Sequence, residues 1–398
     1  MKIQFHKNVI TPHLIVLCVY VFLYSFCTEV NASNSDYLVW NPITFGGHII
    51  VITSLMVLLF FFNIKRYKVD IIFVMLMARF AFLLIPFLYF EGNSTLYFGS
   101  VATNLVIGLI YIVYREMDKW VPNGLKVILA FGLIISIETI ITLIFGDYSW
   151  NDSFFKFVFG IPLGKSNYIG CFILPILGLL LFDIIEIKNI ILKYLFLVIM
   201  ITAIIIIKSR GTWLILFFLL VVYYYKIMKT HSVKKIYMNI FIVIVLIIVL
   251  FNCKVILDFL SSILLGNFNS LSSSQYGFFD RLTSLRSTVN SKAFFKFLEH
   301  PLVGCGPVYL DLDYRAHNIF LDCLYQSGLI GFFLYFGAIV AIFFKTTKNK
   351  LTNKGKNIRI ILSLMILQAM IEPSLLMLPI DFLFWLLVCL MLGERKNT

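Results

Sequence analysis

Charged residues are scarce in this sequence. Asp, Glu, Lys and Arg together make up 13% of the 398 residues, about half their share in ordinary globular domains. Apolar residues make up 61%, and the mean hydropathy is +0.95. A soluble fold cannot hide so much apolar surface behind so few charges. The composition therefore excludes the soluble protein of two or three domains that the length alone would suggest, and it predicts an integral membrane protein.

Cysteine pairs are also missing. The seven cysteines are an odd number, most lie inside apolar runs, and no C-x-x-C motif occurs. No disulfide framework and no cysteine metal site is therefore predicted. The net charge of +13 is basic enough for nucleic-acid binding. Most Lys and Arg residues, however, lie in loops between apolar runs, where they act as topology signals, so we expect no nucleic-acid partner.

Long apolar runs dominate the chain. Such a run must satisfy its own backbone hydrogen bonds in lipid, which only a helix does here, because the alternating segments of an outer-membrane barrel are absent. The fold class predicted is an all-α polytopic membrane protein with about 12 transmembrane helices. The expected spans are 9–28, 43–62, 70–90, 95–114, 124–145, 168–183, 193–208, 211–225, 236–257, 318–344, 358–374 and 377–392.

The distribution of basic residues predicts the orientation. With a cytoplasmic N-terminus, the inner segments hold 22 Lys and Arg residues and the outer segments hold ten. The positive-inside rule therefore places both termini in the cytoplasm. An alternative is that residues 1–32 form a signal peptide, with a cleavage-like site at Val30-Asn31-Ala32. The apolar run is long for that, and no soluble segment follows it.

One connection is much longer than the others. Residues 258–317 separate the ninth and tenth spans on the predicted outer face, and a loop of this length in a compact architecture is usually functional. Within it, 279–299 has the pattern of an amphipathic helix lying at the membrane surface. The chain thus divides into spans one to nine (1–257), a large extracytoplasmic loop (258–317), and spans ten to twelve with a cytoplasmic tail (318–398).

Three outer-face sites carry residues suited to chemistry. The first is KSRGTW, with Lys208 and Arg210 at the membrane interface, where an arginine is either functional or extends to lipid phosphates. The second contains Arg281 and Arg286, which share one helix face, and it continues into HPLVGCGP, a turn by its Pro and Gly content. Each arginine alone is also compatible with contacts to lipid headgroups.

The third site is YRAHNIFLDCLYQSGLIG, where the loop becomes the tenth span. It contains Arg315, His317 and Asn318. A helix N-terminus favours anions nearby, and a neutral imidazole is what a general base requires. The plainer interpretation is that His317 or Asn318 caps a transmembrane helix.

In their order and in their residue motifs, the three sites resemble the O-antigen ligase/polymerase family, the Wzy and WaaL group of lipid-linked glycan transferases. Ser209-Arg210-Gly211 matches its S-R-G/A element, and Arg286 precedes His300 by the family's fourteen residues. One departure is Asn290, at the position of the usual Trp. The last element matches at His317, Asn318, Leu321, Gly328 and Gly331, and Asn167 and Glu372 match more weakly.

The resemblance implies a reaction in the bacterial inner membrane, with the active site on the extracytoplasmic face. A glycan on undecaprenyl diphosphate would be transferred to a sugar hydroxyl. Arginine binds phosphate oxygens bidentately, so Arg210 and Arg286 are the expected diphosphate ligands. Arg281 and Arg315 are second candidates for the same role. His317 is the expected base, and His300 is expected to be structural. Secondary site residues are Asn318, Lys208, Asn167 and Glu372.

The resemblance also implies partners and leaves alternatives open. The partners would be a lipid-linked donor and acceptor, membrane lipids, a chain-length regulator and a flippase. No DxD-like pair marks a divalent-metal site on the outer face, so we expect a metal-independent enzyme without a cofactor. A polymerase of surface polysaccharide repeat units, O-antigen or capsule, is favoured over a ligase that adds O-antigen to lipid A-core. A transporter or flippase is a third possibility, although only Arg79 and Glu138 lie deep in predicted spans.

Overall fold

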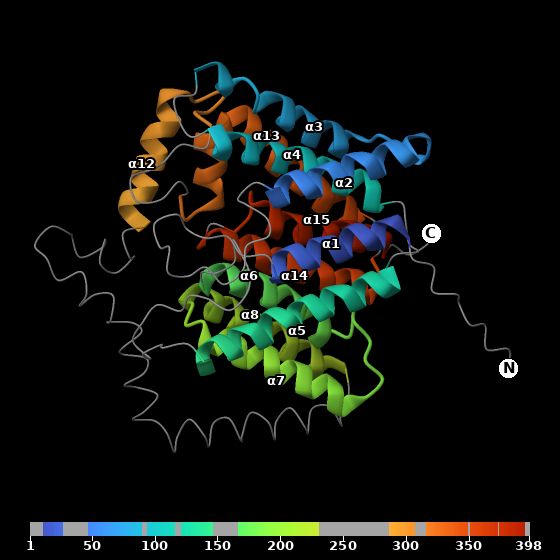
Figure 1. Ribbon diagram of the computed structural model, residues 1–398. Helices are drawn as coiled ribbons and strands as arrows, with labels where there is room; N and C mark the ends of the chain where they lie inside the picture. Colours follow the sequence, from blue (N-terminus) through green and yellow to red (C-terminus); the bar gives the residue numbers. More distant parts are fainter. Residues whose placement is uncertain are drawn as a thin grey trace, which may run out of the picture.

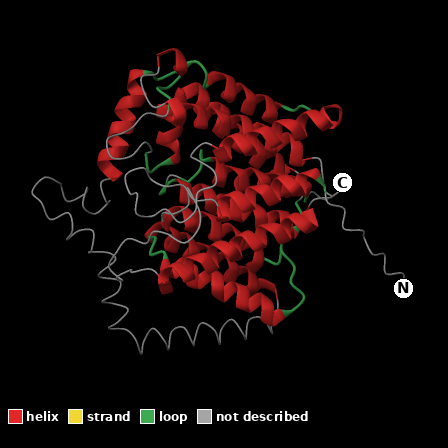
Figure 2. Ribbon diagram, in the orientation of Figure 1, coloured by secondary structure: helices red, strands yellow, loops and turns green. Residues whose placement is uncertain are grey.

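The computed structural model describes residues 11–26, 47–89, 94–115, 121–145, 166–230, 286–306, 316–348, 351–372 and 374–394. In this part of the chain the regular structure is entirely helical (Figure 2). The helices are α1 (Pro12–Phe26), α2 (Gly47–Asn63), α3 (Ile71–Phe82), α4 (Ser94–Arg115), α5 (Val121–Phe145), α6 (Ser166–Leu181), α7 (Ile190–Ile206), α8 (Arg210–Thr230), α12 (Arg286–Glu299), α13 (Ile319–Lys348), α14 (Asn353–Ala369) and α15 (Leu378–Gly393), with short 3-10 turns η2 (Ile64–Arg66) and η3 (Pro86–Tyr89).

Helix α15 lies in the middle of the bundle. Apart from Asp381 in its first turn it is almost entirely apolar, as expected of a helix surrounded by others, and every residue from Leu378 to Leu392 is buried. It packs against α4 on one side and α14 on the other, and α14 in turn contacts α6 and α8. Figure 1 shows α2, α3, α4 and α13 along one side of this centre and α5, α7 and α8 along the other.

The outer helices expose apolar side chains, as a helix facing lipid does. Ile191 on α7 and Phe217 on α8 are examples. Four described helices are long and apolar enough to cross a membrane: α4, α5, α8 and α13. Shorter apolar helices are α1, α2, α3, α6, α7 and α15. These observations confirm that the described part is all-helical and are consistent with a polytopic membrane protein, whereas the number of twelve spans stays a prediction.

The described helices follow the expected spans with shifts at their ends. A helix lies on each expected span except 236–257, which is outside the described residues. The third helix ends at Phe82, well before the expected residue 90, and the chain continues through η3. The expected amphipathic helix 279–299 is described only from Arg286 onward, as α12. The three-part division of the chain is likewise still a prediction.

Helix α12 lies at one end of the bundle against α13 (Figure 1). Its buried stripe contains Val289 and Ala293, one helical turn apart, and these pack with Tyr325 of α13. The opposite face exposes Phe295 and Leu298. This amphipathic division follows the helical period. Arg286 is the first residue of α12.

Candidate active site

Four helices begin around one buried carboxylate. The carboxylate belongs to Glu372, in the connection between α14 and α15. Asn167 lies in the first turn of α6, Arg210 and Arg286 are the first residues of α8 and α12, and His317 lies two residues before α13. Helix N-termini carry partial positive charge from unpaired backbone amides. The fold therefore brings together four helix N-termini, each of which favours a negative charge nearby.

Glu372 is the centre of the cluster. Its side chain is only 2% exposed. Arg286 donates from Nη2 to Glu372 Oε1 at 2.6 Å, and Asn167 donates from Nδ2 to Glu372 Oε2 at 2.6 Å. His317 Nδ1 lies 3.9 Å from Glu372 Oε2. Burial raises the pKa of the Glu372 carboxyl, and the nearby charges of Arg286, His317 and Arg210 oppose that rise. We take the carboxyl to be ionised, because it pairs directly with a guanidinium.

Arg286 is held by two groups of the same connection. In addition to Glu372, its Nη1 donates to the backbone oxygen of Ile371 at 3.1 Å. The guanidinium thus reaches a carboxylate and a carbonyl with different nitrogens, which a lysine could not do in the same geometry. The side chain is 27% exposed, so these contacts leave Arg286 only partly buried.

The start of α13 is fixed by polar side chains. Asn318 Oδ1 accepts from the backbone amides of Phe320 and Leu321, at 2.9 and 3.4 Å, and thereby caps the helix. Asn318 Nδ2 donates to the Met370 carbonyl at 3.5 Å, and buried Asp322 accepts from the Ala316 amide at 2.7 Å. The capping role considered for this site therefore belongs to Asn318. The neighbouring His317 is 20% exposed and directs Nδ1 to the Glu372 side.

The start of α8 is packed tightly against the same connection. Ser209 Oγ accepts from the Thr212 amide at 3.3 Å, which caps α8. A Cβ added to Gly211 would lie 3.1 Å from Glu372 Oε1, so the glycine allows the α8 backbone to approach the carboxylate. Arg210 interacts electrostatically with both Arg286 and Glu372. Lys208 lies in the connection between α7 and α8 with a left-handed backbone (φ 53°).

The structure therefore brings together Arg210, Arg286, His317 and two of the four residues expected to be secondary, Asn167 and Glu372. Arg281 and Arg315 lie outside the described residues. Sequence reasoning ranked Glu372 too low, although a lone carboxylate at the end of an apolar run was a visible signal. Gly211 was expected as part of the S-R-G/A element, but its closeness to Glu372 was not, because a close approach between backbone and carboxylate has no signature in a single sequence.

The middle region of the chain matches a known family. Residues 195–336 match the family model described as O-antigen ligase. The resemblance to the O-antigen ligase/polymerase family is thereby confirmed, and the matched region is assigned to glycan transfer of this general type. The match does not distinguish a ligase from a polymerase. No curated protein matches the chain.

The O-antigen ligase region holds only part of the cluster. Arg210, Arg286, His317 and Asn318 lie inside residues 195–336, whereas Asn167 and Glu372 lie outside them. The carboxylate that pairs with Arg286 is thus contributed by a helix connection beyond the matched region. Among the described residues, no group of three or more His, Cys, Asp or Glu side chains could hold a metal ion.

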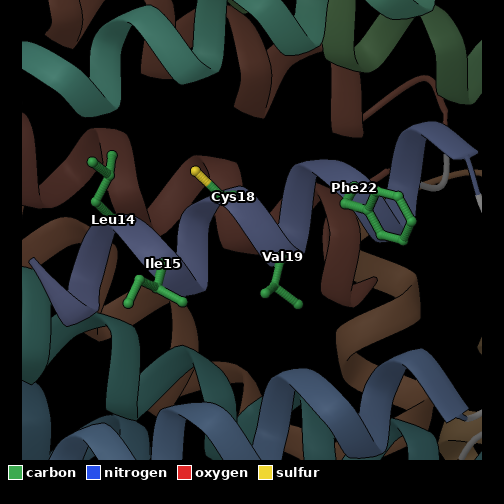
Figure 3. A pocket seen from close by; sticks show the side chains of 5 residues that line it. All are labelled: Leu14, Ile15, Cys18, Val19 and Phe22. Carbon is green, nitrogen blue, oxygen red and sulfur yellow. The ribbon is translucent and has the colours of Figure 1, made fainter. Parts of the chain in front are cut away.

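A surface groove on α1 is unrelated to this cluster. Figure 3 shows its lining side chains along a single helix. They are Leu14, Ile15, Cys18, Val19 and Phe22. The groove offers no charged side chain for a phosphate or a sugar, so it is not a candidate active site.

Proposed function

We propose that the Glu372 cluster binds the diphosphate of a polyprenyl-linked glycan and transfers the glycan to a sugar hydroxyl. The observation that carries the proposal is the convergence of Arg210 and Arg286 with four helix N-termini at one point. A diphosphate is an anion with several acceptor oxygens, and both arginines and helix N-termini favour such a ligand. Arg286, which is only partly buried, takes part in this binding.

The reaction follows from the groups available. His317 accepts the proton of the acceptor hydroxyl as its oxygen attacks the anomeric carbon of the donor. The bond between that carbon and the diphosphate oxygen breaks, and its electron pair stays on the leaving diphosphate. Arg210 and Arg286 stabilise the charge that develops there, so they favour the transition state over the ground state. The proton remains on His317 until it passes to solvent.

Glu372 supports both roles in this proposal. As a buried carboxylate it keeps Arg286 in place, and its Oε2 lies 3.9 Å from His317 Nδ1. An ionised carboxylate at this distance attracts the imidazolium that forms when His317 takes the proton of the acceptor. Glu372 thus acts on the chemistry through Arg286 and His317.

We propose a polymerase of repeat units as the specific activity, because HNIFLDCLYQSGLIG resembles polymerases more than ligases. The ligase that transfers O-antigen to lipid A-core is the second candidate, and the description of the matching family favours it. The two enzymes use the same donor and differ in the acceptor, so residues that bind the diphosphate are expected to be common to both.

We further propose that the cluster faces the extracytoplasmic side of the inner membrane. Helix α8 begins with Arg210 and reaches Lys229 near its end, about 30 Å away at 1.5 Å per residue. The end of the bundle away from Glu372 is rich in basic residues, where Lys354 pairs with Glu186 and Lys345 with Asp70. Such an end is expected to be cytoplasmic by the positive-inside rule.

The decisive experiment supplies the acceptors separately. The purified protein in lipid nanodiscs is given undecaprenyl-diphosphate-linked repeat units alone, and the products are separated on a gel. A polymerase forms a ladder from this substrate. A ligase forms none, and it yields product only when lipid A-core is added with lipid-linked polymer. If neither mixture gives product, glycan transfer is excluded and a transport role becomes the better hypothesis. Addition of EDTA is expected to leave the product unchanged.

A further inference from the structure

Helix α13 is broken in its interior. Gly328 has φ 62° and ψ −170°, a conformation that is neither helical nor accessible to residues with a side chain. The first segment of α13 ends at Ser327 and a second continues from Leu329. A break of this kind leaves carbonyls of the first segment and amides of the second without helical partners.

A short turn satisfies the groups at the break. Residues 301–306, here called the docked turn, follow α12 and lie against it. The amides of Cys305 and Gly306 donate to the carbonyls of Tyr325 and Gln326, at 2.7 and 3.0 Å. In return, Leu329 donates to the Pro301 carbonyl at 2.8 Å, and the next amide, of Ile330, to the Leu302 carbonyl at 3.2 Å. The docked turn therefore exchanges four backbone hydrogen bonds with the broken helix.

Two glycines make this docking possible. Gly304 has φ +78°, and a Cβ there would lie 2.5 Å from the carbonyl carbon of Gln326. At Gly328, a Cβ would lie 2.5 Å from the amide nitrogen of Val303 and closer still to the backbone of Leu302. In both cases the clashing atoms belong to the backbone, which cannot move away by a change of rotamer as a side chain can. The two chain segments thus interlock through a glycine on each side.

The docked turn joins the far ends of the two elements that carry the site. From Arg286, α12 runs about 21 Å to Glu299, and the docked turn then fixes the chain at Gly328. From His317, the first segment of α13 reaches the same point. Val289 and Ala293 of α12 pack against this segment between the two ends. At the near end, both Arg286 and His317 face Glu372.

A buried arginine lies behind the break. Arg79 of α3 is almost completely buried and donates to Asn104 of α4 and to Cys323 Sγ of α13, the latter at 3.7 Å. Its guanidinium also lies 4.5 Å from the ring centroid of Tyr335. A cation beside the C-terminal end of a helical segment is electrostatically favourable. The break is therefore held on one side by the docked turn and on another by α3.

We infer that residues 301–306 are a positioning element, which sets the separation of Arg286 and His317 by fixing α12 to the break in α13. This inference rests on the proposed function of those two residues. Neither Gly304 nor Gly328 contacts the Glu372 cluster, so any effect on turnover passes through the position of α12 and α13. An error of about 1 Å in the placement of reacting groups can cost on the order of 100-fold in rate.

The test replaces the interlocking glycines and measures docking and turnover in the same preparations. Gly328→Ala and Gly304→Ala are expected to lower kcat about 100-fold while KM for the lipid-linked donor changes less than about threefold. Hydrogen–deuterium exchange of the Cys305, Gly306 and Ile330 amides should increase in both variants, whereas exchange in α15 stays slow. Gly337→Ala is the matched control on α13, since its Cβ would meet only the flexible end of Met75.

A milder variant covers the case in which the alanine variants do not fold. Leu329→Pro removes one docking donor, yet proline is well tolerated at the first position of a helical segment, and the extended ψ of Gly328 suits a following proline. A released turn with normal kcat would overturn the inference, and so would a docked turn with low kcat. Failure of the proposed function looks different, because the wild-type protein would then show no glycan transfer although its turn is docked.

Discussion

Replacing Arg286 removes the partner of a buried carboxylate as well as the proposed diphosphate ligand. Arg286→Ala leaves buried Glu372 without its direct ion-pair partner, which is expected to destabilise the protein by up to roughly 3–5 kcal/mol. Arg286→Ala with Glu372→Gln should recover most of that stability, because Asn167 can still donate to the glutamine oxygen. Both variants should form no product. Thermal unfolding measures the stability of each variant, and the nanodisc assay measures the product that it forms.

Two further variants sharpen the arginine prediction. Arg286→Lys keeps the charge but cannot reach both Ile371 and Glu372 with separate nitrogens, so turnover should be severely reduced. Lys292→Ala removes a positive charge from the same helix outside the Glu372 cluster and should retain turnover. A stable double variant with normal turnover would exclude Arg286 from donor binding and would leave only its ion pair with Glu372.

His317 has a role that glutamine cannot replace. His317→Gln keeps hydrogen bonding and approximate size but removes the nitrogen that accepts a proton. We expect turnover to be lost while the donor still binds through the arginines. His300→Gln should lose much less. Near-normal turnover of His317→Gln would show that His317 is not the base, and loss of donor binding would make it a ligand of the diphosphate.

At the scale of elements, the beginnings of helices were easier to predict than their continuity. Apolar runs located the described helices because each helix must be apolar to lie in lipid. The break in α13 was not predicted, since 318–344 is one apolar run and Gly328 within it has several possible explanations. HPLVGCGP was correctly expected to be a turn in its described part, Pro301 to Gly306, yet its docking into α13 depends on a contact between separate segments.

Asp70 connects three helices at the end of the bundle away from Glu372. It caps α3 by accepting from the Phe73 amide at 3.1 Å, accepts from the Tyr111 hydroxyl on α4 at 2.8 Å, and pairs with Arg115 of α4 at 2.7 Å and Lys345 of α13 at 3.5 Å. Burial alone would raise the pKa of Asp70, but these four groups outweigh it and lower the pKa. Ionised Asp70 therefore stabilises the folded protein.

Asp70→Ala should lower the free energy of unfolding by about 1 kcal/mol for the lost cap, with a further loss for the ion pairs. Asp70→Asn keeps the cap and isolates the effect of the charge. Because the folded pKa is lowered, the stabilisation is complete above the ordinary pKa of the carboxyl and is lost as the pH falls through the folded value. Thermal unfolding of the wild-type protein and both variants in detergent, between neutral and acid pH, measures this stabilisation. Equal stability of all three proteins at neutral pH would contradict a linking role for Asp70.

At the scale of the whole molecule, the testable property is orientation. A cysteine at Ser272 should be labelled by a membrane-impermeant reagent added outside the cell, and a cysteine at Lys350 should not. Both positions lie outside the described residues, and the background is a variant without the native cysteines. The expectation follows from the charge difference between the two ends of the bundle. The reverse labelling would place the Glu372 cluster in the cytoplasm and remove the proposed extracytoplasmic reaction.

The sequence by itself determined the class of environment, the location of the helices and the residue types suited to a diphosphate, because hydropathy and charge act locally along the chain. It also indicated Arg210, Arg286 and His317, through the resemblance of their ordered motifs to the O-antigen ligase/polymerase family. Only the tertiary structure decided that Glu372 pairs with Arg286, that Asn167 joins them, and that the turn after α12 completes a broken α13. These relations join segments 20 to 205 residues apart, and close approach between such segments depends on packing geometry that no local pattern records.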